Sequence, residues 1–426
     1  MQKEKILKFP NDFIWGASTS AHQIEGGNYN DWSVWEKANA KKLARKARKK
    51  YQPWQLEKFP EMLEPETYIS GAACDSWNRF DQDLACLKEL GIKAYRFSVE
   101  WSRIEPEEGK FNLEAIARYK DWTKLLRQNN IEPFVALWHY TLPVWFCQKG
   151  GWLHPDAEKL FLRFTEKIVG ALKEEASYWL TFNEPETVVR NGYLAANRPP
   201  QKRSPLKAFK AIKKLVKIHK SAYQLIHKIG GKNMRVSFAE SLVCFESYSR
   251  WPHNLLLKRL FAWWRNDQFV PKVVKHCDFI GLQYYFHSRI RLNPFVSWKW
   301  FQYNENKFGL TDMNWEIYPP GIYHVLKDLK KYNKPIIITE NGLADADDSR
   351  REKFIKEHLR YVHQAIDEGA DVRGYFHWSL LDNFEWAEGW WAKFGLYSVD
   401  RRTFKRTAKP SAKVYARICK ENIIKL

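Results

Sequence analysis

Ile336-Ile337-Ile338-Thr339-Glu340-Asn341-Gly342 joins four β-branched residues, one carboxylate and a turn-forming pair. A continuous β-branched run is typical of a strand buried on both faces, as in a parallel sheet, and Asn-Gly favours a turn directly after it. The stretch therefore predicts a buried strand that presents Glu340 at its C-terminal end. A second carboxylate, Glu184, closes a comparable run in Leu180-Thr181-Phe182-Asn183-Glu184-Pro185.

Strand-like and helix-like segments alternate along the whole chain. Composition and spacing predict strands over residues 13–17, 93–98, 132–138, 178–182, 234–238, 278–282, 335–339 and 372–378. Helical periodicity predicts helices between them, among them 81–90, 113–129, 156–175 and 205–229. Eight alternations favour a closed α/β barrel of the (β/α)8, or TIM, type over a doubly wound open sheet. No Gly-rich phosphate loop follows the first strand, and no linker or short repeat interrupts the chain, so we expect one domain over residues 1–426.

The net charge of +21 is densest between Lys41 and Lys50. Leu43, Ala44 and Ala47 fall on one side of this run, which predicts a basic surface helix. Its charged face is either simply solvated or the docking surface of an anionic partner. The charge does not gather in a recognisable nucleic-acid module, so no nucleic-acid partner is expected.

Six cysteines lie far apart in the sequence, at positions 74, 86, 147, 244, 277 and 419. Their spacing suits neither a zinc site nor a disulfide framework, and we expect reduced thiols in a cytoplasmic protein without a bound metal. Residues 1–5 lead into no long apolar region, so no signal peptide is expected. No apolar stretch reaches membrane-spanning length, so no membrane partner is expected. A monomer and a small homo-oligomer both remain open.

Polar and aromatic residues mark the ends of the predicted strands: Arg96, His139, Asn183, Glu184, Tyr285, Glu340 and Trp378. In a barrel these ends converge on one face, which carries the active site. Two carboxylates on that face suit glycosidic bond cleavage with retention, in which a nucleophile and an acid/base lie about 5–5.5 Å apart. Arg96 would favour the ionised nucleophile by its charge, and the Tyr285 hydroxyl could donate to it. The alternative is two unrelated structural carboxylates.

The chain resembles glycoside hydrolase family 1, the β-glucosidase and β-galactosidase family, from Phe13 to about Pro410. The resemblance rests on motifs that occur in the family's order. They are Phe13-Ile14-Trp15-Gly16-Ala17-Ser18-Thr19-Ser20-Ala21-His22-Gln23-Ile24-Glu25-Gly26, Tyr95-Arg96-Phe97-Ser98, Trp138-His139-Tyr140-Thr141-Leu142-Pro143, Thr181-Phe182-Asn183-Glu184-Pro185, Ile338-Thr339-Glu340-Asn341-Gly342 and Trp378-Ser379-Leu380-Leu381-Asp382-Asn383-Phe384-Glu385-Trp386.

The resemblance implies a retaining exo-β-glycosidase without a cofactor. In that reading Glu340 is the nucleophile, Glu184 is the acid/base, and Arg96 and Tyr285 flank the nucleophile. Hydroxyls of the non-reducing sugar would be bound by Gln23, His139, Asn183, Glu385 and Trp386. Trp378 would form the floor beneath that sugar, and Trp315 would be the platform for the aglycone. Terminal β-glucosyl residues are the expected substrates, with β-galactosyl and β-fucosyl residues as side substrates.

Three features depart from the family pattern. Gln283 stands where the family usually has Asn, and we expect it to change hydrogen bonding near Glu340 or the aglycone. His22 replaces a frequent Tyr, and the chain is shorter than many members, which predicts a more open pocket. At the positions where 6-phospho-glycosidases hold a phosphate stand Glu388, Ala392 and Phe394. A carboxylate there would repel a phosphate, so a neutral sugar is favoured.

Two other functions remain open at this stage. A non-catalytic carbohydrate-binding protein would explain the Gln283 departure and the high charge. A transglycosylating enzyme would use an open, Trp-lined aglycone side, with Trp315, Trp390 and Trp391 as candidate wall residues. The stretch Trp298-Lys299-Trp300-Phe301 is expected to form an entrance wall, with plain packing or a membrane or partner patch as alternatives.

Overall fold

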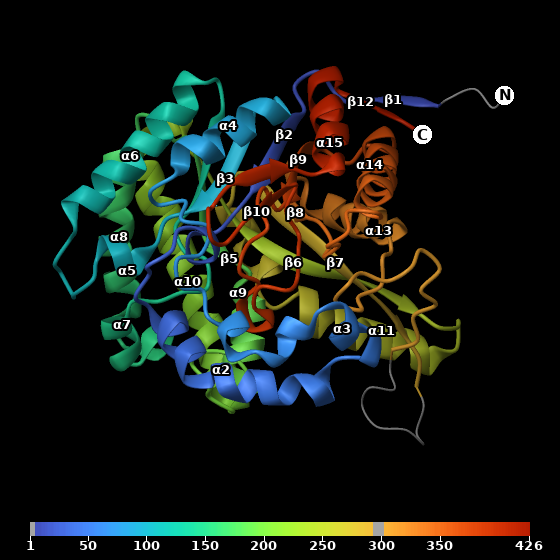
Figure 1. Cartoon of the computed structure of the whole chain (residues 1–426), viewed down its shortest axis with the longest axis horizontal. Helices are drawn as coiled ribbons and strands as arrows, with labels where there is room; N and C mark the ends of the chain where they lie inside the picture. The colour runs from blue at the N-terminus through green and yellow to red at the C-terminus, as the bar shows by residue number, and fades with distance from the viewer. Residues whose placement is uncertain (1–4, 293–301) are drawn as a thin grey trace.

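The computed structural model describes residues 5–292 and 302–426. Eight parallel strands follow one another around a closed barrel, so the (β/α)8 prediction is confirmed (Figure 1). The strands are β2 (Ile14–Ser18), β3 (Ala94–Ser98), β4 (Glu132–Ala136), β5 (Tyr178–Asn183), β6 (Arg235–Ser247), β7 (Ile280–Ile290), β8 (Ile336–Asn341) and β9 (Val372–Trp378).

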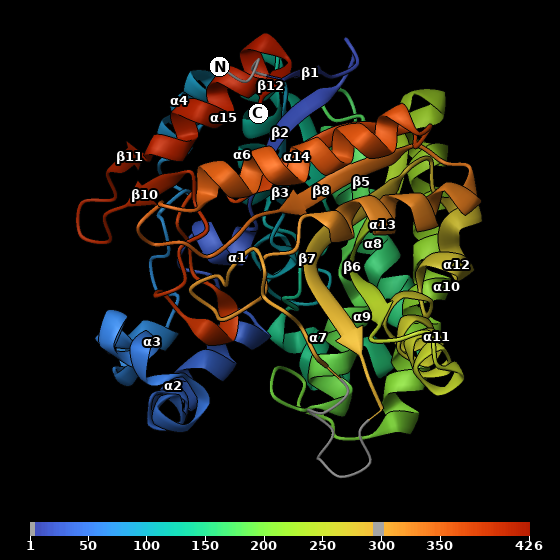
Figure 2. The same cartoon turned by 90° about the vertical axis from the view of Figure 1, so that its right-hand side faces the viewer.

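Helices surround the barrel and fill the connections between strands (Figures 1 and 2). The longer ones are α2 (Asp31–Lys50), α4 (Phe80–Leu90), α6 (Leu113–Gln128), α8 (Ala157–Leu172), α10 (Pro205–Gly230), α11 (Pro252–Asn266), α13 (Pro320–Leu329), α14 (Arg351–Asp367) and α15 (Pro410–Glu421). Short ones are α1 (Ala21–Ile24), α3 (Pro53–Lys58), α5 (Trp101–Ile104), α7 (Val144–Gln148), α9 (Pro185–Val189) and α12 (Val270–Val273). Four helices predicted from periodicity are found within a few residues of their expected bounds.

Two strands run well beyond their predicted ends. Strand β6 continues to Ser247 and β7 to Ile290, whereas the sequence predicted ends at positions 238 and 282. The two extensions pair with each other in parallel, from Ala239 opposite Gly281 to Ser247 opposite Ile290, with a register shift after Leu242. Figure 2 shows β7 running out beside β6 toward α11. Mutual pairing provides hydrogen-bond partners for the backbone groups on the facing edges of both extensions.

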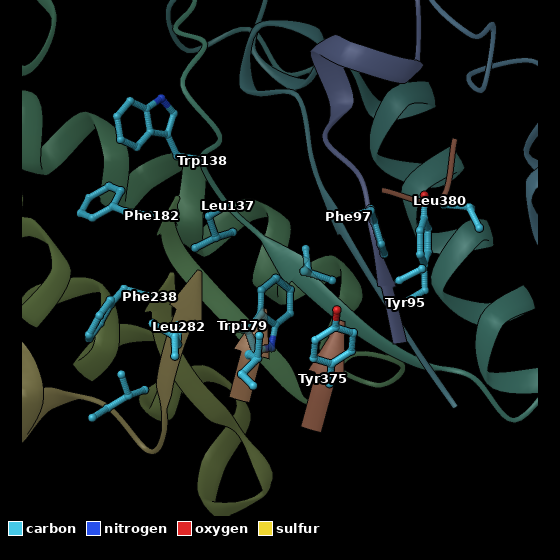
Figure 3. Close-up of a cluster of buried hydrophobic side chains, with 14 of the residues drawn as sticks. Tyr95, Phe97, Leu137, Trp138, Trp179, Phe182, Phe238, Leu282, Tyr375 and Leu380 are labelled. Atoms are coloured by element: carbon cyan, nitrogen blue, oxygen red, sulfur yellow. The ribbon is translucent and has the colours of Figure 1, made fainter. Parts of the chain in front are cut away.

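The core has one layer inside the barrel and one outside it. Inside, Phe134 and Phe376 meet with ring centroids 4.8 Å apart. Gly16 makes room for this layer, because a Cβ there would lie 2.5 Å from the Phe376 ring. Outside, aromatic and aliphatic side chains fill the space between strands and helices. Those labelled in Figure 3 are Tyr95, Phe97, Leu137, Trp138, Trp179, Phe182, Phe238, Leu282, Tyr375 and Leu380.

The basic run lies in the second half of α2, as predicted. Asn30 caps this helix, accepting a hydrogen bond from Ser33 N at 2.8 Å. Ala44 and Ala47 are buried, while the lysines and arginines of the run are exposed. The six cysteines form no disulfide.

The chain termini lie next to each other. Strand β1 (Ile6–Lys8) pairs antiparallel with β12 (Ile423–Lys425), as Figure 1 shows, and β10 (Tyr397–Val399) pairs with β11 (Arg406–Ala408). Within residues 5–292 and 302–426, no helix is long and apolar enough to cross a membrane.

Candidate active site

Glu340 is the next-to-last residue of β8 and is 4% exposed. Its strand is held on both sides: Ser18 Oγ donates to Thr339 O at 2.7 Å, and Asn341 Nδ2 donates to Tyr284 O at 2.7 Å. The strand includes Asn341, which was predicted to belong to the turn. Gly342 is required by a close approach rather than by a positive φ angle, because a Cβ there would lie 1.7 Å from the Trp378 carbonyl oxygen. Glu340 is thus held within the sheet, at a point where the pairing of β8 with β7 and with β9 shifts register.

Two donors reach the Glu340 carboxylate. Arg96 Nη1 donates to Oε1 in a buried ion pair, and the Tyr285 hydroxyl donates to Oε2 at 2.9 Å. Burial raises the pKa of Glu340 to about 7, and the nearby charge of Glu184 adds to this. The Arg96 charge and the two hydrogen bonds oppose the rise. The predicted contacts of Arg96 and Tyr285 are both present.

Asn183 is the centre of a hydrogen-bond network beside this pair. Its Oδ1 accepts from Arg96 Nη2 and from Gln283 Nε2, the latter at 2.7 Å. Because two donors meet Oδ1, the amide Nδ2 points the other way, to His139 Nε2 at 3.0 Å. The Gln283 departure therefore acts on Asn183, and no hydrogen bond joins it to Glu340.

Glu184 occupies the turn between β5 and α9, with φ of 44° in the left-handed region. Its N–H donates to Ala239 O at 2.8 Å, and Pro185 directly after it begins α9. The Tyr140 hydroxyl donates to Glu184 Oε2. Tyr140 also has a positive φ, of 72°. Sequence reasoning gave Tyr140 no role, although it follows His139 within a quoted motif.

The residues expected to bind sugar hydroxyls come together around two tryptophans. Trp386 stacks on His139 at 5.8 Å and on His22 at 5.4 Å between ring centroids. Trp378 also stacks on His139, with ring centroids 6.0 Å apart. Gln23 Nε2 donates to Glu385 Oε2 at 3.4 Å, which brings Gln23 and Glu385 into the same group.

Two buried side chains of this group have shifted pKa values. Burial, together with the Arg96 charge, lowers the pKa of His139 well below its usual value, so its ring is neutral at neutral pH. Burial raises the pKa of Glu385 to about 8, against the charge of Arg198. Both side chains can therefore donate a hydrogen bond to a neutral ligand at neutral pH.

Trp315 is half-buried and lines a cleft of about 850 Å³ together with Phe286, whose ring centroid lies 4.7 Å away. Its role as the platform for the aglycone stays a prediction. The other two wall candidates do not lie on such a surface. Trp391 is 0% exposed and packs on Phe59, and Trp390 donates its indole N–H to Ile69 O at 2.9 Å. Packing, rather than an open wall, accounts for both.

Glu388 is paired with the end of the basic helix. Lys50 Nζ lies 2.6 Å from Oε1, and the Tyr51 hydroxyl donates to Oε2. Burial opposes ionisation of Glu388, but the Lys50 charge and these hydrogen bonds hold its pKa below the usual value. Ala392 and Phe394 are buried. The carboxylate thus faces a lysine, so its repulsion of a phosphate is weaker than the sequence implied.

Residues 298–301 lie outside the described residues, so the expected entrance wall is not part of the structure. Among residues 5–292 and 302–426, no group of three or more His, Cys, Asp or Glu side chains could hold a metal ion. What the site offers is two carboxylates in different settings, one ion-paired and one bonded to a phenol. Such a pair can serve a nucleophile and an acid/base.

Comparison with known proteins gives one consistent family. A model of glycosyl hydrolase family 1 matches residues 5–257 and 233–424. Beta-glucosidase A of Thermotoga maritima is 30% identical, over 98% of this chain and 99% of the relative. Beta-glucosidase A of Acetivibrio thermocellus is 32% identical, with coverage of 98% and 99%.

Solved structures agree. A beta-glycosidase from Pyrococcus horikoshii is 37% identical with a TM-score of 0.87, covering 99% of this chain and 97% of the other. A beta-glucosidase from Thermotoga maritima in complex with glucoimidazole is 28% identical with a TM-score of 0.84, covering 97% and 99%. The chain therefore belongs to glycosyl hydrolase family 1 and is a glycosidase.

Proposed function

We propose that the enzyme is a retaining exo-β-glycosidase that releases terminal, non-reducing β-D-glucosyl residues. β-Galactosides and β-fucosides are proposed as side substrates. The observation that carries the proposal is the setting of Glu340, a strand-end carboxylate bonded by Arg96 and Tyr285 and within electrostatic reach of Glu184. The names of the beta-glucosidase relatives support the choice of sugar.

The reaction takes two steps at the anomeric carbon. Ionised Glu340 forms a bond to that carbon while the bond to the leaving oxygen breaks, and Glu184 gives its proton to that oxygen. Glu340 loses its charge in the glycosyl-enzyme, which makes it easier for Glu184 to remain a base. Glu184 then takes a proton from the water that attacks the same carbon, and Glu340 leaves as a carboxylate.

The sugar would be held by the group around Trp386. His139 accepts from Asn183 at Nε2, so its proton is on Nδ1, an atom without a hydrogen-bond partner among the described residues. We assign that N–H to a substrate hydroxyl. Trp378 forms the stacking floor. Hydroxyls are also assigned to Gln23, Asn183, Glu385 and Trp386, and the aglycone to Trp315.

The decisive experiment uses a nitrophenyl β-glucoside. We expect hydrolysis with β-configured glucose as the first product, seen by NMR. Glu340→Ala should abolish turnover, and added azide should partly restore it. Near-normal activity of this variant would show that the nucleophile is misassigned.

A covalent 2-fluoro-glucosyl adduct located on Glu340 by mass spectrometry would eliminate a non-catalytic carbohydrate-binding role. Transglycosylation is a second candidate activity, favoured by the cleft beside Trp315, which offers room for an acceptor. Product ratios with and without an added alcohol acceptor separate the two outcomes. The sugar is proposed to be neutral, which a 6-phosphoglucoside used as a competing substrate tests.

We also propose a cytoplasmic location and a monomer or small homo-oligomer. The six free thiols support the first, because disulfides are rare in that compartment. Cell fractionation tests the location, and light scattering of the purified protein tests the assembly.

A further inference from the structure

A cleft lies beside Trp315, the residue proposed as the aglycone platform. It holds about 850 Å³ and lies along the extensions of β6 and β7. Phe286, in its wall, directly follows the Tyr285 that donates to Glu340, and Tyr285 lies 6.3 Å from the Trp315 ring. This cleft is therefore the space we assign to the aglycone.

Two arginines, Arg190 and Arg265, form part of the cleft wall. Arg190 follows α9 and is half-buried, as is Arg265 near the end of α11. Within the described parts of the chain, neither guanidinium forms an ion pair with a carboxylate within 4.0 Å, and Arg190 Nη1 is buried without a hydrogen-bond partner. Burial and the charge of Arg265 lower the pKa of Arg190 to about 9. Two cations thus share a partly dehydrated wall.

A second cavity lies next to the two arginines. Arg190 and Arg265 also border a second cavity, of about 150 Å³, whose other lining is largely apolar and includes Phe209 and Trp264. The guanidiniums therefore lie between two open spaces.

Three buried carboxylates near this wall have other partners. Glu316, in the cleft wall, bonds His287 Nδ1 at 2.6 Å. Glu186 Oε1 accepts from Phe269 N at 2.6 Å, and Glu240 Oε2 accepts from Glu186 N at 3.2 Å. Burial raises the pKa of Glu186 to about 7 and that of Glu240 well above its usual value. Burial thus disfavours the ionised forms of Glu186 and Glu240, and none of the three carboxylates pairs with Arg190 or Arg265 within 4.0 Å.

We propose that Arg190 and Arg265 bind an anionic group on the aglycone, while the neutral sugar occupies the site beside Trp378. This deepens the proposed function, on which it rests, by naming the substrate class: β-glycosides whose leaving group carries a carboxylate, sulfate or phosphate. The charge belongs on the aglycone because Arg190 and Arg265 line the same cleft as Trp315, the proposed aglycone platform. A planar guanidinium suits each of these anions, and an orphaned buried donor gains most from such a partner.

The test compares two matched substrates, 4-carboxyphenyl and 4-carbamoylphenyl β-D-glucoside, which differ in one charge. The readout is the ratio of their kcat/KM values, measured by released glucose. Arg190→Gln and Arg265→Gln should each lower this ratio about tenfold or more, the usual effect of one charge-assisted hydrogen bond. Arg190→Lys should keep most of the ratio. Added salt should lower the ratio for the wild-type enzyme.

Arg259→Gln is the control, because it removes the same charge. Arg259 lies on α11, as Arg265 does, but it is exposed and does not line the cleft. It should leave the ratio unchanged. Sulfophenyl and phosphonophenyl glucosides then show which anion is preferred.

An unchanged ratio in both Gln variants, with thermal unfolding showing that they fold, would overturn the proposal. So would an equal fall in the Arg259 variant, which would indicate a general charge effect. Either result leaves the proposed function standing if the wild-type enzyme hydrolyses the carboxamide substrate. Inactivity of the wild-type enzyme on both substrates and on nitrophenyl β-glucoside would instead refute the proposed function.

Discussion

Replacing Tyr285 by Phe removes the hydroxyl that donates to Glu340 Oε2 at 2.9 Å and keeps the ring. The hydrogen bond favours the ionised carboxylate, so its loss raises the pKa of Glu340 above its present value of about 7. A hydrogen bond to a charged group contributes about 1.5–3 kcal/mol, and one pKa unit corresponds to about 1.4 kcal/mol. Arg96 remains in place, so we expect the lower end of this range, a rise of about one unit.

The assay is the pH dependence of kcat/KM, whose acidic limb reports the ionisation of an essential base in the free enzyme. Glu340 must be ionised to attack, so activity is lost as the pH falls through its pKa. The wild-type limb should lie near pH 7, and the Tyr285→Phe limb should lie about one unit higher. About one unit below the wild-type limb, the variant should be roughly tenfold less active than the wild type by this effect alone.

Tyr375→Phe is the matched control, because that buried hydroxyl bonds Asn341 Oδ1 at 3.0 Å and does not bond Glu340. Its acidic limb should stay in place. A Tyr285→Phe limb that is unmoved, or that shifts to lower pH, would refute the reasoning about the carboxylate's hydrogen bond.

Two further substitutions test the turn regions around the carboxylates. Tyr140→Phe removes the hydroxyl that donates to Glu184. We expect kcat/KM to fall about tenfold for an alkyl glucoside, because its leaving group needs a proton, and much less for a dinitrophenyl glucoside. Equal losses on both substrates would contradict a link to proton transfer. Gly342→Ala would place a Cβ 1.7 Å from the Trp378 carbonyl oxygen, which is a clash with backbone. We expect the free energy of unfolding, measured in urea, to fall by at least about 3 kcal/mol. An unchanged urea midpoint would show that the backbone moves apart at little cost.

Local periodicity was enough to predict the barrel and the positions of its strand-end residues. A parallel strand buried on both faces has a distinctive composition, and the residue after it must lie on the barrel's C-terminal face. That rule placed Glu340 and Asn183 on one face without any knowledge of their contacts. The resemblance then supplied roles for residues that periodicity alone left unassigned, such as Gln23.

Features that depend on contacts between distant segments were missed or misjudged. The extensions of β6 and β7 are stabilised by each other, so neither sequence segment predicts its own length. The pairing of Glu388 with Lys50 joins residues from opposite ends of the chain, and the burial of Trp391 depends on Phe59 from the α3 region. Tyr140 was overlooked because its role depends on one contact, the hydrogen bond from its hydroxyl to Glu184. Each of these is a property of packing rather than of local sequence.

Arg96 connects the charge of the nucleophile to the recognition of the sugar. Its guanidinium is 0% exposed and donates to Glu340 with one nitrogen and to Asn183 with another. A buried guanidinium without a counter-charge is costly, so it stabilises ionised Glu340. The same guanidinium orients the Asn183 amide, with Gln283 as a second donor, and the amide in turn fixes the proton of His139 on Nδ1. A change at Gln283 should therefore act first on sugar binding, through Asn183 and His139, whereas a change at Arg96 should affect both binding and nucleophilic attack.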